Sequence, residues 1–114
     1  MNFVNQFQIK NSKGELLNVC EGNNLENTKG VVLFLHGIGA HHQVIHECLD
    51  CFPYKSSLFE SSNYKSYALE FSGHGKSEGL RCSIDVYDDL IDEIRSMILF
   101  IKEKYENKKI FIYA

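Results

Sequence analysis

Two glycine-rich segments contain the residues whose types and spacing could support chemistry. Residues 73–79 read GHGKSEG, and residues 36–39 read HGIG. Residues 75–79 also fit the G-x-S-x-G pattern, which presents a nucleophilic serine, here Ser77, on a tight strand-to-helix turn. With one of the five histidines as general base, Ser77 would attack an acyl carbon. The alternative is that both segments are turns in which glycine supplies a positive φ.

The N-terminal part of the chain predicts a β-hairpin and then a buried strand. Apolar and polar residues alternate in Phe3–Ile9, turn-forming residues occupy Asn11–Gly14, and Leu16–Cys20 forms the returning strand. A polar loop over residues 21–30 leads into the unbroken apolar run Val31–Leu35. Such a run is typical of a strand buried on both faces, so we expect a parallel sheet.

Helices and strands alternate in the rest of the chain. Residues Gln43–Phe52 have helical spacing and are followed by Pro53, which ends the helix. Tyr64–Phe71 is predicted as a second buried strand, and Ile110–Ala114 as a third.

Between these two strands the spacing predicts an amphipathic helix with Ser83 as its N-cap. Acidic residues come early and lysines late, which suits the helix dipole. The predicted apolar face consists of Ile84, Tyr87, Leu90, Ile91, Ile94, Ile98 and Ile101.

The order of these elements predicts an α/β fold, in which a β-hairpin is followed by a βαβαβ unit. Alternating strands and helices form a parallel sheet with helices on its faces. Ligands of such sheets bind at the carboxyl ends of the strands. Both glycine-rich segments follow a predicted strand, so we expect them at this edge.

Length and charge restrict the class of protein. The chain has 114 residues and a net charge of -3, without a cluster of basic residues, so we expect one domain over residues 1–114 and no nucleic-acid partner. No apolar run reaches the roughly 18 residues that a transmembrane helix needs, and the N-terminus lacks a signal-peptide pattern. A cytoplasmic location is therefore expected.

The four cysteines include one C-x-x-C pair, Cys48 and Cys51, with histidines nearby. A zinc site would need a second pair of ligands, either another C-x-x-C or two suitably spaced histidines after Cys51, and the sequence has neither. Cys48 and Cys51 also lie in a predicted helical segment rather than after a strand. We predict reduced thiols, with a redox or zinc pair as the alternative, and expect neither a metal nor a cofactor.

These segments together resemble the monoacylglycerol lipase and lysophospholipase branch of the α/β-hydrolases, within the S33 serine aminopeptidase-like group. The resemblance rests on HGIG after the first buried strand, GHGKSEG after the second, and the acidic start of a helix at residues 85–89. It covers nearly the whole chain. HG-x-G alone is a weak signal, whereas its combination with GHG-x-S-x-G and the acidic helix is specific.

The resemblance implies a role for each glycine-rich segment. In the family the first loop gives one backbone N–H to the oxyanion hole, which maps to Ile38, with Gly37 allowing the substrate to approach. His36 and Gly39 belong to the same loop, and the histidine orients it. The second segment is implied to be a structural loop, formed by Gly73, His74, Gly75 and Ser77.

Two features depart from the family pattern. Relatives commonly have an aspartate two residues before GHG, where this chain has Phe71, preceded by Glu70. In the family the strand equivalent to Ile110–Ala114 runs into the nucleophile elbow, followed later by the acid and the histidine. The resemblance therefore implies the N-terminal half of the hydrolase sheet, with all three triad positions beyond residue 114. We do not assign Ser77 to the elbow. In a nucleophile elbow the helix follows the serine directly, whereas the next helix predicted in this chain begins only after Cys82.

The predicted function is hydrolysis of acyl esters such as monoglycerides or lysophospholipids, with the chain inactive on its own. The alternative is a non-catalytic binding or interaction remnant of a hydrolase. In either case the strand at 110–114 would present an unpaired apolar edge, and we expect association through it.

Overall fold

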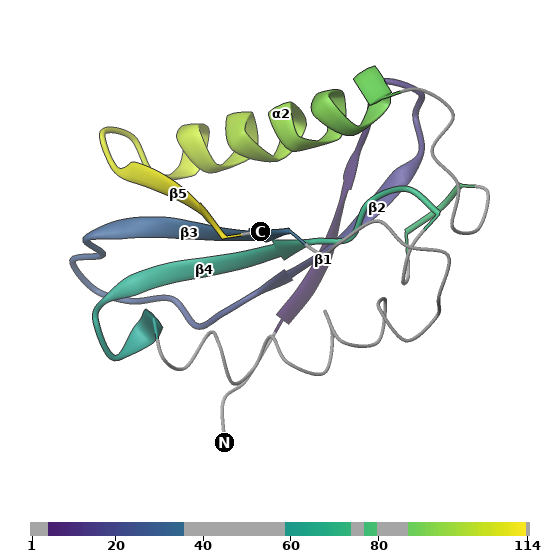
Figure 1. The fold of residues 1–114 in the computed structure, drawn as a ribbon. Helices are drawn as coiled ribbons and strands as arrows, with labels where there is room; N and C mark the ends of the chain where they lie inside the picture. The colour runs from purple at the N-terminus through teal and green to yellow at the C-terminus, as the bar shows by residue number, and fades with distance from the viewer. Residues whose placement is uncertain (1–4, 36–58, 74–76, 80–86, 114) are drawn as a thin grey trace.

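The computed structural model describes residues 5–35, 59–73, 77–79 and 87–113. It contains five strands and one long helix within these ranges (Figure 1). The elements are β1 (Asn5–Lys10), β2 (Leu16–Glu21), β3 (Gly30–Leu35), β4 (Tyr64–Leu69), α2 (Tyr87–Lys104) and β5 (Lys109–Tyr113). The helix predicted over Gln43–Phe52 lies outside the described residues.

The strands form one mixed sheet in the order β1-β2-β4-β3-β5. β3 pairs in parallel with β4 and with β5, as the sequence predicts. The hairpin strands β1 and β2 are antiparallel to each other, and β2 continues the sheet by pairing antiparallel with β4. The expected α/β fold is confirmed, with a parallel part of three strands extended by the hairpin.

The turn of the hairpin is organised by Asn11. Its side-chain oxygen accepts hydrogen bonds from the backbone N–H groups of Lys13 (3.0 Å) and Glu15 (2.9 Å). Gly14, at φ 80°, completes the turn by donating its N–H to the Asn11 carbonyl. The predicted turn is therefore confirmed, and the asparagine amide replaces backbone pairing where the chain reverses.

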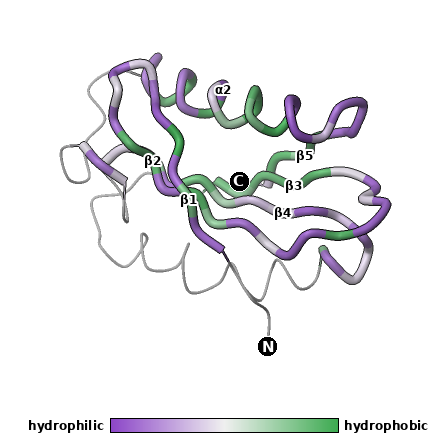
Figure 2. The backbone as a smooth tube through the Cα atoms, turned by 180° about the vertical axis from the view of Figure 1, so that it is seen from behind, coloured by the Kyte–Doolittle hydropathy of each residue, from purple (hydrophilic) through white to green (hydrophobic). Residues whose placement is uncertain are grey.

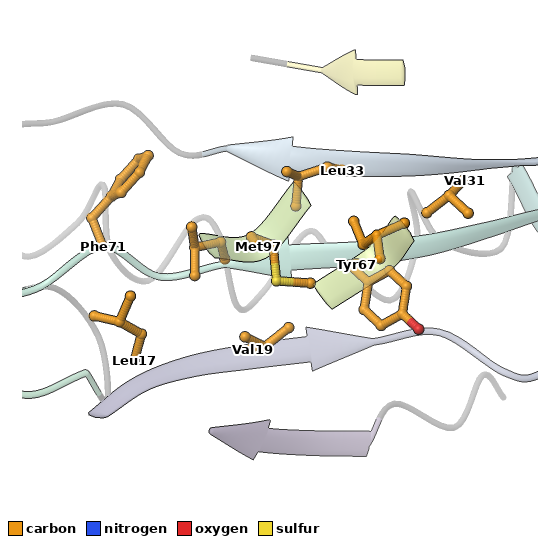
Figure 3. Packing of buried hydrophobic residues seen from close by; sticks show 9 residues of the cluster. Leu17, Val19, Val31, Leu33, Tyr67, Phe71 and Met97 are labelled. Atoms are coloured by element: carbon orange, nitrogen blue, oxygen red, sulfur yellow. The ribbon is translucent and has the colours of Figure 1, made fainter. Parts of the chain in front are cut away.

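β3 is buried on both faces, as its apolar run predicts. Val31 and Leu33 belong to the core between the sheet and α2, whereas Val32 and Phe34 pack on the opposite face. Figure 3 shows side chains from β2, β3, β4 and α2 converging in the first of these clusters. Its fully buried members include Leu17, Val19, Tyr67, Leu69, Met97 and Ile101.

α2 lies along one face of the sheet (Figures 1 and 2). Side chains on one side of the helix pack into the core cluster. Asp88 and Asp89 occupy its first turn and Lys102 and Lys104 its last turn, as predicted. The prediction for Ile91 is wrong, because its side chain is 39% exposed. The side of α2 that faces the core contains Leu90, Glu93, Ile94 and Met97, at positions i, i+3, i+4 and i+7. Glu93 and Met97 are buried, Leu90 and Ile94 are partly buried, and Ile91 lies outside this face. The predicted N-cap, Ser83, lies outside the described residues.

β4 is shorter than predicted. Its pairing with β3 and β2 ends at Leu69, two residues before Phe71. Beyond this point Glu70 donates its N–H to the carbonyl of Asn18 on β2, while Phe71 remains buried in the core.

Among the described residues, no helix has both the length and the apolar character that a membrane-spanning helix needs.

Candidate functional site

The candidate site lies at the carboxyl edge of the parallel strands. β3 ends at Leu35 and β4 at Leu69, and these two residues are paired, so both glycine-rich segments start from the same edge. The first segment, residues 36–39 with the predicted oxyanion donor, lies outside the described residues, as do His74 and Gly75. Gly73 and Ser77 are described.

Ser77 is buried, with 2% of its surface exposed. Its Oγ accepts a hydrogen bond from the backbone N–H of Asn18 (2.8 Å) and donates one to the carbonyl of Glu70 (2.5 Å). The hydroxyl proton therefore points at a backbone carbonyl. Nucleophilic serines instead present an accessible hydroxyl to a general base. The geometry is that of a serine that fastens its loop to β2.

Two glycines give this loop its shape. Gly73 has φ 76° and Gly79 has φ 114°, both in the region that L side chains rarely adopt. A Cβ atom on Gly79 would lie 2.9 Å from the backbone nitrogen of Gly73. The last glycine of the G-x-S-x-G match is therefore required by close packing of the loop on itself.

Glu78 extends the connection between the loop and β2. Its backbone N–H donates to the carbonyl of Leu16, and its Oε1 accepts from the N–H of Leu16, each at 2.8 Å. Its carbonyl accepts from the N–H of Gly73, also at 2.8 Å, and so closes the loop. The backbone of Leu16, at the start of β2, is therefore hydrogen-bonded to this loop, because β4 pairs with β2 only from Val19 onward.

Glu70, one residue before the position where the family pattern predicts an aspartate, is completely buried. Its Oε1 accepts a hydrogen bond of 2.6 Å from the side-chain amide of Asn18. The same amide also donates to Gln6 on β1 (3.2 Å). Glu70 therefore links the end of β4 to both strands of the hairpin.

Glu93 is a buried residue of this region that the sequence analysis missed. It is 2% exposed, and its carboxylate accepts from the N–H of Ser72 (2.9 Å) and from the side-chain amide of Asn11 (3.1 Å). The only sequence signal is its place beside the apolar stripe of α2, where a charged residue is unexpected.

A second buried polar cluster lies at the opposite end of β4. Lys65 has no exposed surface, and its Nζ donates to the carbonyl of Gly22 (2.6 Å) and to Asn24 Oδ1 (2.9 Å). The carboxylate of Glu21 lies 3.2 Å away. Burial lowers the pKa of the Lys65 amine from its ordinary value of 10.5, and the neighbouring Glu21 opposes this shift only in part. This cluster fixes the loop after β2 and lies away from the candidate site.

Tyr67 belongs to the core cluster between β4 and α2 (Figure 3). Its ring lies 5.3 Å from the Nζ of Lys65 and is completely buried. Burial, followed by the neighbouring Tyr105, raises the pKa of the phenol far above its usual value of 10.0. Tyr67 is therefore a neutral core residue.

The alternative metal or redox pair, Cys48 and Cys51, lies outside the described residues. Within residues 5–35, 59–73, 77–79 and 87–113, no group of three or more His, Cys, Asp or Glu side chains is placed to hold a metal ion. Cys20, which is described, is buried in the apolar cluster that includes Val32, Phe34 and Ala68.

Comparison with known solved structures identifies the fold. A carboxyl esterase from Bacillus coagulans shares 15% identity at a TM-score of 0.69 and is matched by 97% of this chain. An esterase from Pyrococcus furiosus shares 21% identity at a TM-score of 0.66, again over 97% of the chain. An alpha-beta serine hydrolase homologue from Coxiella burnetii shares 13% identity at a TM-score of 0.71, over 95%.

The chain spans only part of these structures, at 36%, 41% and 50% of their lengths respectively. A search of the curated proteins gave no match. The family model described as serine aminopeptidase, S33, matches residues 26–114, which include both glycine-rich segments. The chain therefore belongs to the S33 serine aminopeptidase family of α/β-hydrolases.

Proposed function

We propose that this chain is part of a serine hydrolase that cleaves acyl esters. The observation that carries the proposal is the family match over residues 26–114, which includes the segments HGIG and GHGKSEG. Two of the structures with a similar fold are esterases, which supports an ester as the bond that is cleaved. The motif combination of the monoacylglycerol lipase and lysophospholipase branch suggests a monoglyceride or lysophospholipid as substrate.

In this proposal residues 36–39 stabilise the transition state. The backbone N–H of Ile38 would donate to the oxygen that becomes negatively charged when the ester carbonyl is attacked. A fixed backbone donor stabilises this charge without reorganising during the reaction. Gly37 leaves room for the substrate, and His36 and Gly39 hold the loop.

The nucleophilic serine, its acid and its histidine lie, in this proposal, outside residues 1–114. Ser77 does not replace the nucleophile, because its buried hydroxyl donates to the Glu70 carbonyl. Residues 73–79 instead shape the edge of the sheet beside the substrate. Residues 1–114 alone are therefore expected to lack esterase activity.

The test is to express the whole open reading frame that encodes this chain and to measure hydrolysis of p-nitrophenyl butyrate, a monoacylglycerol and a lysophospholipid. Ile38→Pro removes the proposed donor, whereas Ile38→Ala keeps it. Loss of one oxyanion donor lowers kcat by roughly 100- to 1,000-fold. We expect this loss for the proline variant only, with KM changed little. Equal activity of folded proline and alanine variants would contradict the assignment, and absence of hydrolysis of all three esters would contradict the function.

A second candidate function is association without catalysis, which the exposed side chains of β5 favour. Phe111, Ile112 and Tyr113 are each about half exposed, at 49%, 51% and 49%. They line an apolar groove of about 290 Å³ together with Val32, Phe59 and Tyr64. Exposed apolar strands of this kind pair with other strands.

A further inference from the structure

Two buried carboxylates join the hairpin (β1 and β2) to the segment after β4, which comprises residues 70–73 and 77–79. Glu70 connects to β2 through Asn18, and Glu93 connects Ser72 to the hairpin turn through Asn11. A buried carboxylate is costly unless its oxygens accept hydrogen bonds. These contacts therefore contribute to the stability of the segment rather than merely occupying space.

Glu93 uses its two oxygens for two different parts of the chain. Oε1 accepts the backbone N–H of Ser72, and Oε2 accepts the side-chain amide of Asn11. The partner Asn11 is 82 positions away in the sequence. A glutamine at this position has only one acceptor oxygen, so its NH₂ group would face one of the two donors.

Asn11 cannot rotate its amide to relieve such a mismatch without losing other bonds. Its oxygen accepts from the N–H groups of Lys13 and Glu15. Its nitrogen donates to Glu15 Oε1 (2.9 Å) as well as to Glu93. The turn therefore fixes which side of the amide meets α2.

The rest of the hairpin contacts the same segment along β2. The N–H of Asn18 donates to Ser77, and the N–H of Leu16 donates to Glu78. The turn also reaches α2 through Lys13 Nζ, 2.7 Å from Asp89, but this pair is exposed and contributes little. The buried bonds through Glu93 and Asn18 therefore couple the hairpin to the segment, together with the two bonds between Leu16 and Glu78.

We propose that the β1–β2 hairpin and residues 70–73 and 77–79 open and close as one cooperative unit, with Glu93 as the positioning residue that couples them. Regions of a protein that share buried contacts unfold locally as units. The functional role of this unit rests on the proposed hydrolase function. In that case the unit would set the shape of the carboxyl edge of the sheet, where the substrate binds. A partner or ligand that displaces the hairpin would displace this edge with it.

Hydrogen exchange of the 114-residue chain, followed by NMR for each amide, tests the coupling. We expect Glu93→Gln to accelerate exchange of Ser72 and Gly73 and, equally, of Gly14 and Glu15 in the turn. An unsatisfied buried group costs enough to give about tenfold faster exchange or more. Amides of the β3–β4 ladder should change far less. Glu103→Gln, an exposed site on the same helix, should leave all of them unchanged.

A variant with reversed hydrogen-bond polarity shows whether the bond itself is responsible. In Asn11→Asp with Glu15→Gln and Glu93→Gln, residue 11 becomes the acceptor and the two glutamines become donors. We expect this triple variant to recover most of the protection that Glu93→Gln loses in both regions. Acceleration of Ser72 alone, uniform acceleration across the sheet, or failure of the recovery would overturn the proposal. The measurement involves no catalysis, so its outcome is independent of whether the esters are cleaved.

Discussion

Lys65 shows how a single charged residue can be accommodated in the middle of a core. Its amine is surrounded by the carbonyl of Gly22, the amide oxygen of Asn24 and the carboxylate of Glu21. Two of these groups accept hydrogen bonds from the amine and the carboxylate supplies a nearby negative charge, which together compensate for part of the lost contact with water. The pKa of the amine is nevertheless lowered, which indicates that these contacts do not fully compensate for burial of the charge.

This shift predicts how stability depends on pH. Between the lowered pKa and 10.5 the folded chain binds fewer protons than the unfolded chain, so stability from Lys65 rises with pH through this interval. The free energy of unfolding of wild type, minus that of Lys65→Met, should therefore increase as pH approaches 10.5. Urea unfolding at several pH values measures it.

The control for this prediction is Lys29→Met, which removes an exposed lysine from the loop before β3. Its difference from wild type over the same pH range is the baseline. A Lys65→Met difference that follows this baseline would contradict the lowered pKa of the Lys65 amine.

Among the structural elements, the loop after β4 depends most on a particular backbone geometry. Gly79 combines φ 114° with a neighbouring backbone nitrogen that leaves no room for a Cβ atom. Gly14 has φ 80° but nothing within 4 Å of its Cβ position. Substitution of Gly14 therefore measures the cost of the positive φ angle alone. Substitution of Gly79 adds the cost of the close contact.

We predict that Gly14→Ala lowers the free energy of unfolding by about 1–2 kcal/mol, the cost of a left-handed conformation. Gly79→Ala should cost more, about 3 kcal/mol or above, because strain and overpacking add. Chemical denaturation of both variants gives the comparison. Equal losses would mean that the loop relaxes around the added methyl group.

The sequence predicts those elements whose formation depends on local pattern. Val31–Leu35 is apolar at every position and forms the doubly buried β3, and Asn11–Gly14 contains the residues of a tight turn. Polar burial was missed because it depends on partners that are distant in the sequence. Glu93 is buried beside Asn11, and Lys65 beside Gly22. No periodicity in either segment indicates such a partner.

For the candidate site, the pattern of residues predicts where the two glycine-rich segments lie but not what they contact. The position of residues 73–79 after a buried strand follows from the alternation of strands and helices. The G-x-S-x-G match does not tell whether Ser77 is exposed, whereas its hydrogen bonds to Asn18 and Glu70 do. The role of Ile38 stays a prediction.

At the scale of the whole molecule, the exposure of the outer strand β5 is the feature from which association can be predicted. Within the described sheet it pairs with β3 and is the last strand in the order. Its residues Phe111, Ile112 and Tyr113 are about half exposed, and neither proline nor a charged side chain interrupts them. Natural edge strands usually carry such features to prevent pairing.

We therefore predict that the 114-residue chain self-associates and that Ile112→Lys weakens this association by about tenfold or more. Leu99→Lys, on α2, is the control, because Leu99 is equally exposed (55%) but lies on a helix. Sedimentation velocity over a range of concentrations measures both. Unchanged association of the Ile112 variant, or equal weakening by the Leu99 variant, would exclude the edge as the interface.

From its burial and its two hydrogen bonds we infer that Ser77 supports a loop of the hydrolase fold and is not a nucleophile. Reaction of the folded 114-residue chain with a fluorophosphonate probe tests it most directly, with Ser77→Ala and Ser96→Ala as variants and an active serine esterase as positive control. We predict no labelling of wild type or of either variant, because the Ser77 hydroxyl is buried and donates to the Glu70 carbonyl. Labelling of wild type that persists in Ser96→Ala and disappears in Ser77→Ala would contradict the account.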